Sequence, residues 1–400
     1  MEVINMNFDQ VNQRYGTYSM KWDGAQNVYH NPDVIPMWIA DMDFQSPQPV
    51  IDAIKKQAAT GIYGYTTEPN MTAIPQIIAT WLQQQNHWTI NPDNLGYSAG
   101  VVNGLGLAIR ALTQKGDAII TQTPLYGHFK IAVENSKRQL ISNPLIKKDG
   151  AYSFDWDNLE KQISDNQVKM VILCNPHNPT GRVWTNEELK RFAQICQQHQ
   201  VIILSDDIHS DLILPGNTYQ PLAKIYPEYQ DHIITFKSPS KTFNLAGLQF
   251  AYYYTTNPDY QKQMQSAAAY ASNPDLPTAF ALPALTAAYQ DSQDWLHELL
   301  AYLADNLQWL TEEIETQTPA QVTRSQATYL SWIDVSYLRC SEDELLTALD
   351  AGGIGVQTNR EFGLDEQAGL FIRLNFATPR ELLETGVIRL IKVLQQLEKD

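Results

Sequence analysis

The stretch that decides the fold covers residues 168–210 and reads VKMVILCNPHNPTGRVWTNEELKRFAQICQQHQVIILSDDIHS. It begins with one apolar run and closes with a second, and both runs stop at polar residues. Between them, residues 187–200 place apolar side chains on one helical face, and Thr185 and Glu188 have the spacing of a capping box. A strand, a helix and a second strand in this order predict a parallel βαβ unit.

The same alternation continues on both sides of this unit. Residues 118–121 and 232–236 are further short apolar runs, separated from the first two by polar segments of helical length. Short buried strands that alternate with helices predict an α/β fold with a mainly parallel, doubly wound sheet. Ligands of such sheets bind at the carboxyl ends of the strands, and the polar clusters of this chain lie there.

The C-terminal part has a different pattern. A long leucine-rich amphipathic segment is followed by strand-like residues 329–333 and 369–374 and by a last helix from about Pro379. This pattern predicts a smaller α+β domain. We therefore divide the chain into an N-terminal arm that also contributes to the small domain (1–45), a large domain (46–285) and a small C-terminal domain (286–400).

Composition excludes several classes of function. The 400-residue chain has a formal net charge of −16, which disfavours binding to nucleic acid. The odd number of cysteines, the absence of CxxC and the long spacings disfavour disulfides and a zinc site and favour a reducing compartment. The N-terminus lacks the pattern of a signal peptide, and no apolar run approaches the length of a membrane span. We expect a cytoplasmic protein without a membrane segment.

A lysine follows the strand at 232–236 in the segment SPSKTFNLAG, residues 238–247. Lys241 stands between two small hydroxyl residues at the end of this strand. An amine that can lose its charge forms imines with carbonyl compounds, and nearby hydroxyls can hold a phosphate. The alternative is an ordinary solvated loop lysine, and Lys237 is a rival for the imine.

Two earlier segments suit a phosphate and a flat ring. GVVNG, residues 100–104, precedes a helical segment, and free N–H groups at a helix start favour a phosphate. Tyr126 follows the strand at 118–121 and has the right shape to stack on a ring. The alternatives are a plain helix cap and a packed core tyrosine.

Two segments at strand ends supply an amide and a carboxylate. NPHNPTG, residues 175–181, forces a tight turn that fixes Asn178. Neighbouring strand residues point to opposite faces, so only one of Asp206 and Asp207 can face a ligand. A carboxylate there would keep a pyridine nitrogen protonated; the weaker alternative is a metal pair of Asp206 with His209.

Arg373 lies in a late apolar strand, where a buried guanidinium needs an anion. That anion is either a substrate carboxylate or a structural Asp or Glu partner. Together, a phosphate cradle, a stacking ring, an amide, a carboxylate, a lysine and an arginine are the parts that a pyridoxal-phosphate site needs.

In this order the motifs resemble those of the fold-type I pyridoxal-phosphate enzymes of the class I/II aminotransferase family. Within it the chain is most similar to the cystathionine β-lyase group that includes the bacterial C–S lyases. The resemblance covers nearly the whole chain. It rests on RYGT (14–17) leading to KWD (21–23), PMWIADMDF (36–44), GYT (64–66), CNPHNP (174–179), GRVWT (181–185), SPSKTFNLAGL (238–248) and RLNFATP (373–379).

The resemblance implies a role for each matching residue. The catalytic residues would be Lys241, which holds the cofactor as an imine and later carries the α-proton, and Tyr126, which stacks on the ring. Asp206 would pair with the ring nitrogen, Asn178 would bond the phenolic oxygen, and His209 would lie near one of these atoms. The phosphate would be held by Val101, Val102, Ser238, Ser240 and the partner subunit's Tyr65, and the substrate carboxylate by Arg373, Asn178 and the backbone near Ala40.

The activity that the resemblance implies is a C–S β-lyase acting on a small amino-acid thioether. Such an enzyme cleaves cystathionine or a related cysteine S-conjugate to a thiol, pyruvate and ammonia, in a homodimer whose subunits share the active site. The choice among cystathionine, cystine, cysteine and other thioethers stays open. Asp207 departs from the Glu that is usual in the group, and Ala327 from a Gly.

Three other functions are weighed against the lyase. An aminotransferase shares the motifs, and only the group-specific stretches favour the lyase. A regulatory protein that kept the cofactor fold would act through a surface partner, because the acidic chain disfavours DNA. A dehydrogenase is disfavoured because no GxGxxG follows the early strands.

Overall fold

The structure is a computed structural model that describes residues 6–270 and 276–399. The first five residues of the predicted N-terminal arm therefore lie outside the described residues.

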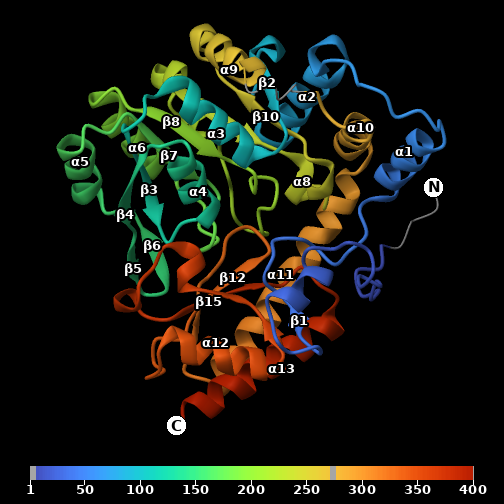
Figure 1. Ribbon diagram of the computed structural model, residues 1–400, viewed down its shortest axis with the longest axis vertical. Coiled ribbons are helices and arrows are strands. Elements are labelled where there is room, and N and C mark those ends of the chain that lie inside the picture. The colour runs from blue at the N-terminus through green and yellow to red at the C-terminus, as the bar shows by residue number, and fades with distance from the viewer. Residues whose placement is uncertain (1–5, 271–275, 400) are drawn as a thin grey trace.

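A seven-stranded sheet forms the centre of the large domain (Figure 1). The five strands β9, β8, β7, β3 and β4 run parallel to one another, whereas β10 is antiparallel to both β2 and β9. The predicted mainly parallel α/β sheet is confirmed. In spatial order its strands are β2 (Leu95–Ser98), β10 (Ala251–Tyr254), β9 (Ile233–Lys237), β8 (Ile202–Asp206), β7 (Met170–Cys174), β3 (Ala118–Thr123) and β4 (Gln139–Pro144).

Helices cover both faces of this sheet because its buried strand residues alternate between two apolar clusters. One face packs against α3 (Val101–Leu112), α4 (Gly127–Asn135) and α9 (Pro258–Tyr270). The other packs against α2 (Ile74–Asn86), α5 (Trp156–Asp165), α6 (Asn186–Gln198), α7 (Leu222–Ile225) and α10 (Ala281–Asp291). The predicted capping box of α6 is present: the Thr185 hydroxyl accepts from the Glu188 N–H and the Glu188 carboxylate accepts from the Thr185 N–H.

The small domain contains a four-stranded antiparallel sheet. Its strands are β11 (Gln321–Val322), β12 (Leu330–Asp334), β15 (Phe371–Asn375) and β14 (Gln357–Thr358), and its helices are α11 (Gln293–Gln317), α12 (Glu342–Ala351) and α13 (Arg380–Leu397). The boundary placed near residue 285 falls inside α10 and stays a prediction.

The predicted N-terminal arm (1–45) and the helix that follows it contact both predicted domains. The arm's strand β1 (Ile35–Pro36) pairs with β13 (Ile354–Gly355) of the small domain, and α1 (Gln48–Ala58) then packs against α10 (Figure 1). The segment between β1 and α1 therefore passes between the domains. Within the described residues, no helix is both long and apolar enough to cross a membrane.

Candidate active site

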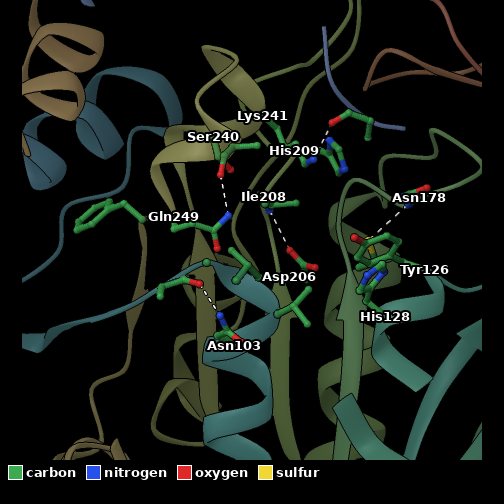
Figure 2. A pocket seen from close by; sticks show the side chains of 18 residues that line it. Asn103, Tyr126, His128, Asn178, Asp206, Ile208, His209, Ser240, Lys241 and Gln249 are labelled. Carbon is green, nitrogen blue, oxygen red and sulfur yellow. Dashed lines mark hydrogen bonds between the residues drawn. The ribbon is translucent and has the colours of Figure 1, made fainter. Parts of the chain in front are cut away.

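A cavity of about 310 Å³ lies at the carboxyl ends of β7 and β8, beside the start of α3. In Figure 2, Asn103 and Gln249 lie on one side of the view, Tyr126 and Asn178 on the other, and Asp206 lies between them. The strand runs predicted from the sequence end here because the carboxyl ends of parallel strands share one edge of the sheet.

The start of α3 forms one wall of the cavity. Gly100 precedes the helix at a φ of 97°, a conformation that glycine adopts without strain, and no side chain caps the helix start. The N–H groups of Val101 and Val102 belong to the first turn, where a helix has no internal acceptors for them. This wall therefore suits an anionic group such as a phosphate.

Lys241 projects into the cavity from the one-turn helix α8 (Pro239–Thr242). Its Nζ donates a hydrogen bond to the Ala40 carbonyl oxygen at 2.7 Å. The pKa of this amine is lowered to about 8, because burial and Arg373 lower it by more than Asp41 and Asp206 raise it. An amine with this pKa is partly neutral near physiological pH and is available as a nucleophile or base.

The rival lysine lies elsewhere. Lys237 is 2% exposed, and its Nζ contacts Asn86 Oδ1 at 3.0 Å and Asp211 Oδ1 at 3.5 Å. It is not among the residues that line the cavity. The geometry therefore favours Lys241 over Lys237 as the reactive amine.

The two neighbouring aspartates separate as their alternating strand positions require. Asp206 lines the cavity, and its pKa is raised to about 7, because burial and Asp207 raise it by more than the Ile208 N–H and Lys241 lower it. Asp207 turns away and accepts hydrogen bonds from the Ser205 hydroxyl at 2.6 Å and from the Tyr219 hydroxyl. Asp206 is thus the carboxylate that can meet a ring nitrogen in the cavity.

Asn178, Tyr126 and His209 also line the cavity. Burial lowers the pKa of His209 to about 3, so its imidazole is neutral, and its Nδ1 has no hydrogen-bond partner among the described residues. No group of three or more His, Cys, Asp or Glu suited to a metal occurs in the described part of the chain. The metal reading of Asp206 and His209 therefore gains no support.

Arg373, on β15, is 2% exposed and is not among the residues that line the cavity. It donates to three uncharged acceptors, which are Asn178 Oδ1 at 3.1 Å, the Trp38 carbonyl oxygen at 2.7 Å and Gln357 Oε1. Its Nε is buried without a partner among the described residues. A buried cation with neutral acceptors and a spare donor suits an added carboxylate.

Of the remaining predicted site residues, two line the cavity and two do not. Ala40 and Ser240 line the cavity, whereas Ser238 lies outside its lining and donates to the Phe250 carbonyl oxygen at 2.6 Å. Tyr65 is 99% exposed and is also not among the lining residues.

Asn103 lies within the predicted phosphate segment 100–104 but had no role of its own there. Sequence reasoning also assigned no role to the lining residues Ala99, His128, Cys174, Ile208, Ala246, Gln249 and Phe250. The ring of His128 stacks on that of Tyr126, with centroids 4.8 Å apart, so its position two residues beyond a predicted stacking ring was an available signal. Gln249 and Phe250 follow the segment of Lys241, and only the fold brings them back to the start of α3.

Comparisons with known proteins agree with this geometry. The family model "Aminotransferase class I and II" matches residues 32–390. Cystathionine beta-lyase PatB of Bacillus subtilis (strain 168) is 37% identical over 388 residues, which are 96% of this chain and 99% of that protein.

Two solved structures extend the likeness to three dimensions. A PLP-bound C-S lyase from Staphylococcus hominis has a TM-score of 0.89 and 32% identity, covering 98% of this chain and 99% of that chain. Cystalysin from Treponema denticola, whose structure contains pyridoxal 5'-phosphate, has a TM-score of 0.92 and 31% identity with the same coverage.

The chain therefore belongs to the class I and II aminotransferase family and has the type I fold of pyridoxal-phosphate (PLP) enzymes. Within the family its relatives include cystathionine β-lyase and C–S lyases, the group that the sequence motifs indicated.

Proposed function

We propose that this chain is a PLP-dependent C–S β-lyase that cleaves L-cystathionine or a related cysteine S-conjugate to a thiol, pyruvate and ammonia. The observation that carries the proposal is the joint presence in one cavity of the Lys241 amine and the Asp206 carboxylate, beside the uncapped start of α3. Lyase chemistry is favoured by the cystathionine β-lyase and the C–S lyases that the chain matches across almost its full length, at a higher identity than the aspartate aminotransferases.

The residues present fit the cofactor. The open N–H groups of Val101 and Val102 suit its phosphate, and Ser240 adds a hydroxyl to the lining of the same cavity. Ser238 would act through Ser240, because its own hydroxyl contacts Ser240 Oγ at 2.8 Å. Asp206 would pair with the ring nitrogen, Asn178 and the neutral His209 would face the phenolic oxygen, and Tyr126 would cover one face of the ring.

When bound, the cofactor supplies a protonated ring that withdraws electrons from the substrate's α-carbon. Arg373 binds the substrate α-carboxylate together with Asn178, whose Oδ1 already accepts from the guanidinium at 3.1 Å. This contact fixes the α-carbon relative to Lys241.

Lys241 moves the proton in this reaction. Its amine, with a pKa lowered to about 8, removes the proton from the α-carbon and becomes an ammonium. The electron pair left at Cα then forms a Cα=Cβ double bond as the Cβ–S bond breaks. The Cβ–S electron pair leaves with the sulfur, and the thiolate takes up a proton to become the thiol product. Hydrolysis of the remaining three-carbon fragment gives pyruvate and ammonia.

The second candidate is an aminotransferase, favoured by the description of the family model. It differs in where the proton held by Lys241 goes. Cystathionine is therefore supplied without any 2-oxo acid, and pyruvate and thiol are followed over many turnovers. Continuous release of both products supports the lyase. A transaminase would leave the C–S bond intact, release no thiol, convert one equivalent of cystathionine to its 2-oxo acid and resume only with an added 2-oxo acid.

The proposal includes a homodimer with shared active sites. Tyr65 is 99% exposed, and its neighbours Ile62 and Tyr63 also expose apolar surface, as expected for a loop that enters a second copy. In that arrangement the partner subunit's Tyr65 reaches the phosphate. We also place the enzyme in the cytoplasm, because all three cysteines are free thiols.

A further inference from the structure

A series of buried polar contacts runs beneath the cavity and links the neighbours of its two main titratable residues. It starts at Thr242, which follows Lys241, and ends at Asp207, which follows Asp206. Its members are Thr242, Asp211, Lys237, Tyr219 and Asp207, all of them buried. None of the five lines the cavity, and none has a role in the proposed reaction.

At the lysine end, the Thr242 hydroxyl donates to Asp211 Oδ2 at 3.0 Å. The same oxygen accepts from Trp81 Nε1 at 3.3 Å, and Asp211 Oδ1 pairs with Lys237 Nζ at 3.5 Å. Lys237 also bonds Asn86 Oδ1 at 3.0 Å. Helix α8 is therefore tied through one carboxylate to the end of β9 and to helix α2.

At the aspartate end, Lys237 Nζ lies 5.6 Å from the centre of the Tyr219 ring. The Tyr219 hydroxyl donates to Asp207, which also accepts from the Ser205 hydroxyl at 2.6 Å. Lys237 is close enough to lower the pKa of Asp207, and Asp207 raises that of Asp206. The contacts therefore run without a break from Thr242 to Asp207. The charge of Lys237 acts on the pKa of Asp207, and the charge of Asp207 acts on that of Asp206.

We propose that the Lys237–Asp211 pair, with Thr242, Tyr219 and Asp207, is a positioning network that fixes Lys241 relative to Asp206. It deepens the proposed function, on which it rests, because it assigns Lys237 to support the reactive lysine. A buried ion pair costs desolvation free energy and adds little net stability. We therefore attribute to this pair a role in fixing the geometry of the site rather than in stabilising the fold. Helix α8 is only one turn long and cannot hold Lys241 rigidly by itself.

The first test uses the hydroxyl link in the holoenzyme. Thr242→Val removes the bond to Asp211 at nearly constant volume, and Thr242→Ser keeps it. The circular dichroism of the cofactor's visible absorption band reports the geometry of the cofactor on Lys241. We expect a weaker or inverted band in Thr242→Val and a wild-type band in Thr242→Ser.

The second test uses the charges. Removing a cation favours a bound proton nearby and removing an anion disfavours it. The pH midpoint of the cofactor absorbance should therefore rise in Lys237→Met and fall in Asp211→Asn, by about half a pH unit or more in each. The charged groups nearest Lys241, which are Asp41, Arg373 and Asp206, are unchanged in every variant.

Lys224→Met is the matched control. Lys224 Nζ bonds the backbone oxygen of the same Asn86 at 2.8 Å but belongs to no part of the network, so its midpoint should equal that of the wild type. If the Lys237→Met variant does not fold because Asp211 has lost its cation, the comparison of Thr242→Val with Thr242→Ser still tests the network.

The network would be purely structural if the folded Thr242→Val variant kept the wild-type band, or if both charge variants shifted the midpoint in one direction or not at all. Failure of the proposed function gives a different result, because the wild-type protein with added cofactor would then develop no visible band.

Discussion

Lys241 Nζ and the Ala40 carbonyl oxygen are 2.7 Å apart, so the amine at the end of a large-domain strand is bound to the segment between the domains. The same segment accepts from the small domain, through Arg373 on the Trp38 oxygen and Asn375 on the Ile39 oxygen. The amine and the guanidinium are therefore aligned through one short stretch of backbone. This alignment is what a reaction at the α-carbon of an amino acid requires.

Replacing Lys241 by Ala should abolish turnover. Loss of the base and of the covalent attachment point lowers the rate by at least about 10³-fold. Borohydride reduction followed by mass spectrometry should locate the cofactor on Lys241 in the wild-type protein. Attachment at Lys237 instead would contradict the assignment.

The lowered pKa of Lys241 predicts the pH dependence of its reactivity. In the cofactor-free protein, acetylation of Lys241 should increase around pH 8, whereas the lysine of a free reference peptide in the same sample should follow the usual lysine pKa of 10.5. Mass spectrometry of both lysines in one sample measures this difference. Equal pH midpoints of acetylation at the two lysines would contradict the lowered pKa of Lys241.

The same shift predicts the pH dependence of stability. Between about pH 8 and 10.5 the protonated fraction of Lys241 is smaller in the folded state than in the unfolded state. The free energy of unfolding of the cofactor-free protein should therefore gain a contribution that rises with pH through this window. Lys241→Met should lack that contribution, which denaturant titrations at several pH values measure.

Arg373→Gln should weaken substrate binding. Loss of charge-assisted hydrogen bonds to the substrate carboxylate lowers kcat/KM by about 10- to 100-fold, mainly through KM. Arg360→Gln is the control, because Arg360 is half-exposed in an ion pair with Asp343 and Glu342 and should change kcat/KM by less than about twofold. The assignment of Arg373 to the substrate carboxylate would be contradicted if Arg373→Gln lost stability and kept KM.

Mixing two inactive variants tests the shared site. Tyr65→Phe and Lys241→Ala should each have low activity as homodimers. A mixed dimer contains one site with an intact Lys241 and the intact Tyr65 of the partner subunit, so mixing after mild dissociation should restore activity. No gain on mixing, with dimers formed, would show that Tyr65 acts within its own subunit or not at all.

The chain order of the motifs predicted much of the site. Gly100 to Val102, Tyr126, Asn178, Asp206 and Lys241 each follow a strand or start a helix, and α/β topology brings such positions to one edge. The exceptions are residues whose role depends on side-chain direction. Ser238 turns its hydroxyl into the backbone of Phe250, and His128 reaches the cavity by stacking on Tyr126.

Sequence alone determined the sheet, the carboxyl-end location of the site and the choice of reactive residue types, because these follow from apolar periodicity, turn chemistry and residue order. The resemblance of the motifs assigned roles to Lys241 and Asp206, but only the tertiary structure shows that these two residues line the cavity and that Lys237 and Asp207 do not. In each case two similar side chains lie a few residues apart, and burial and long-range partners separate their roles. Those partners, such as Asn86 and Asp211 for Lys237, come from distant parts of the chain and are found only once it is folded.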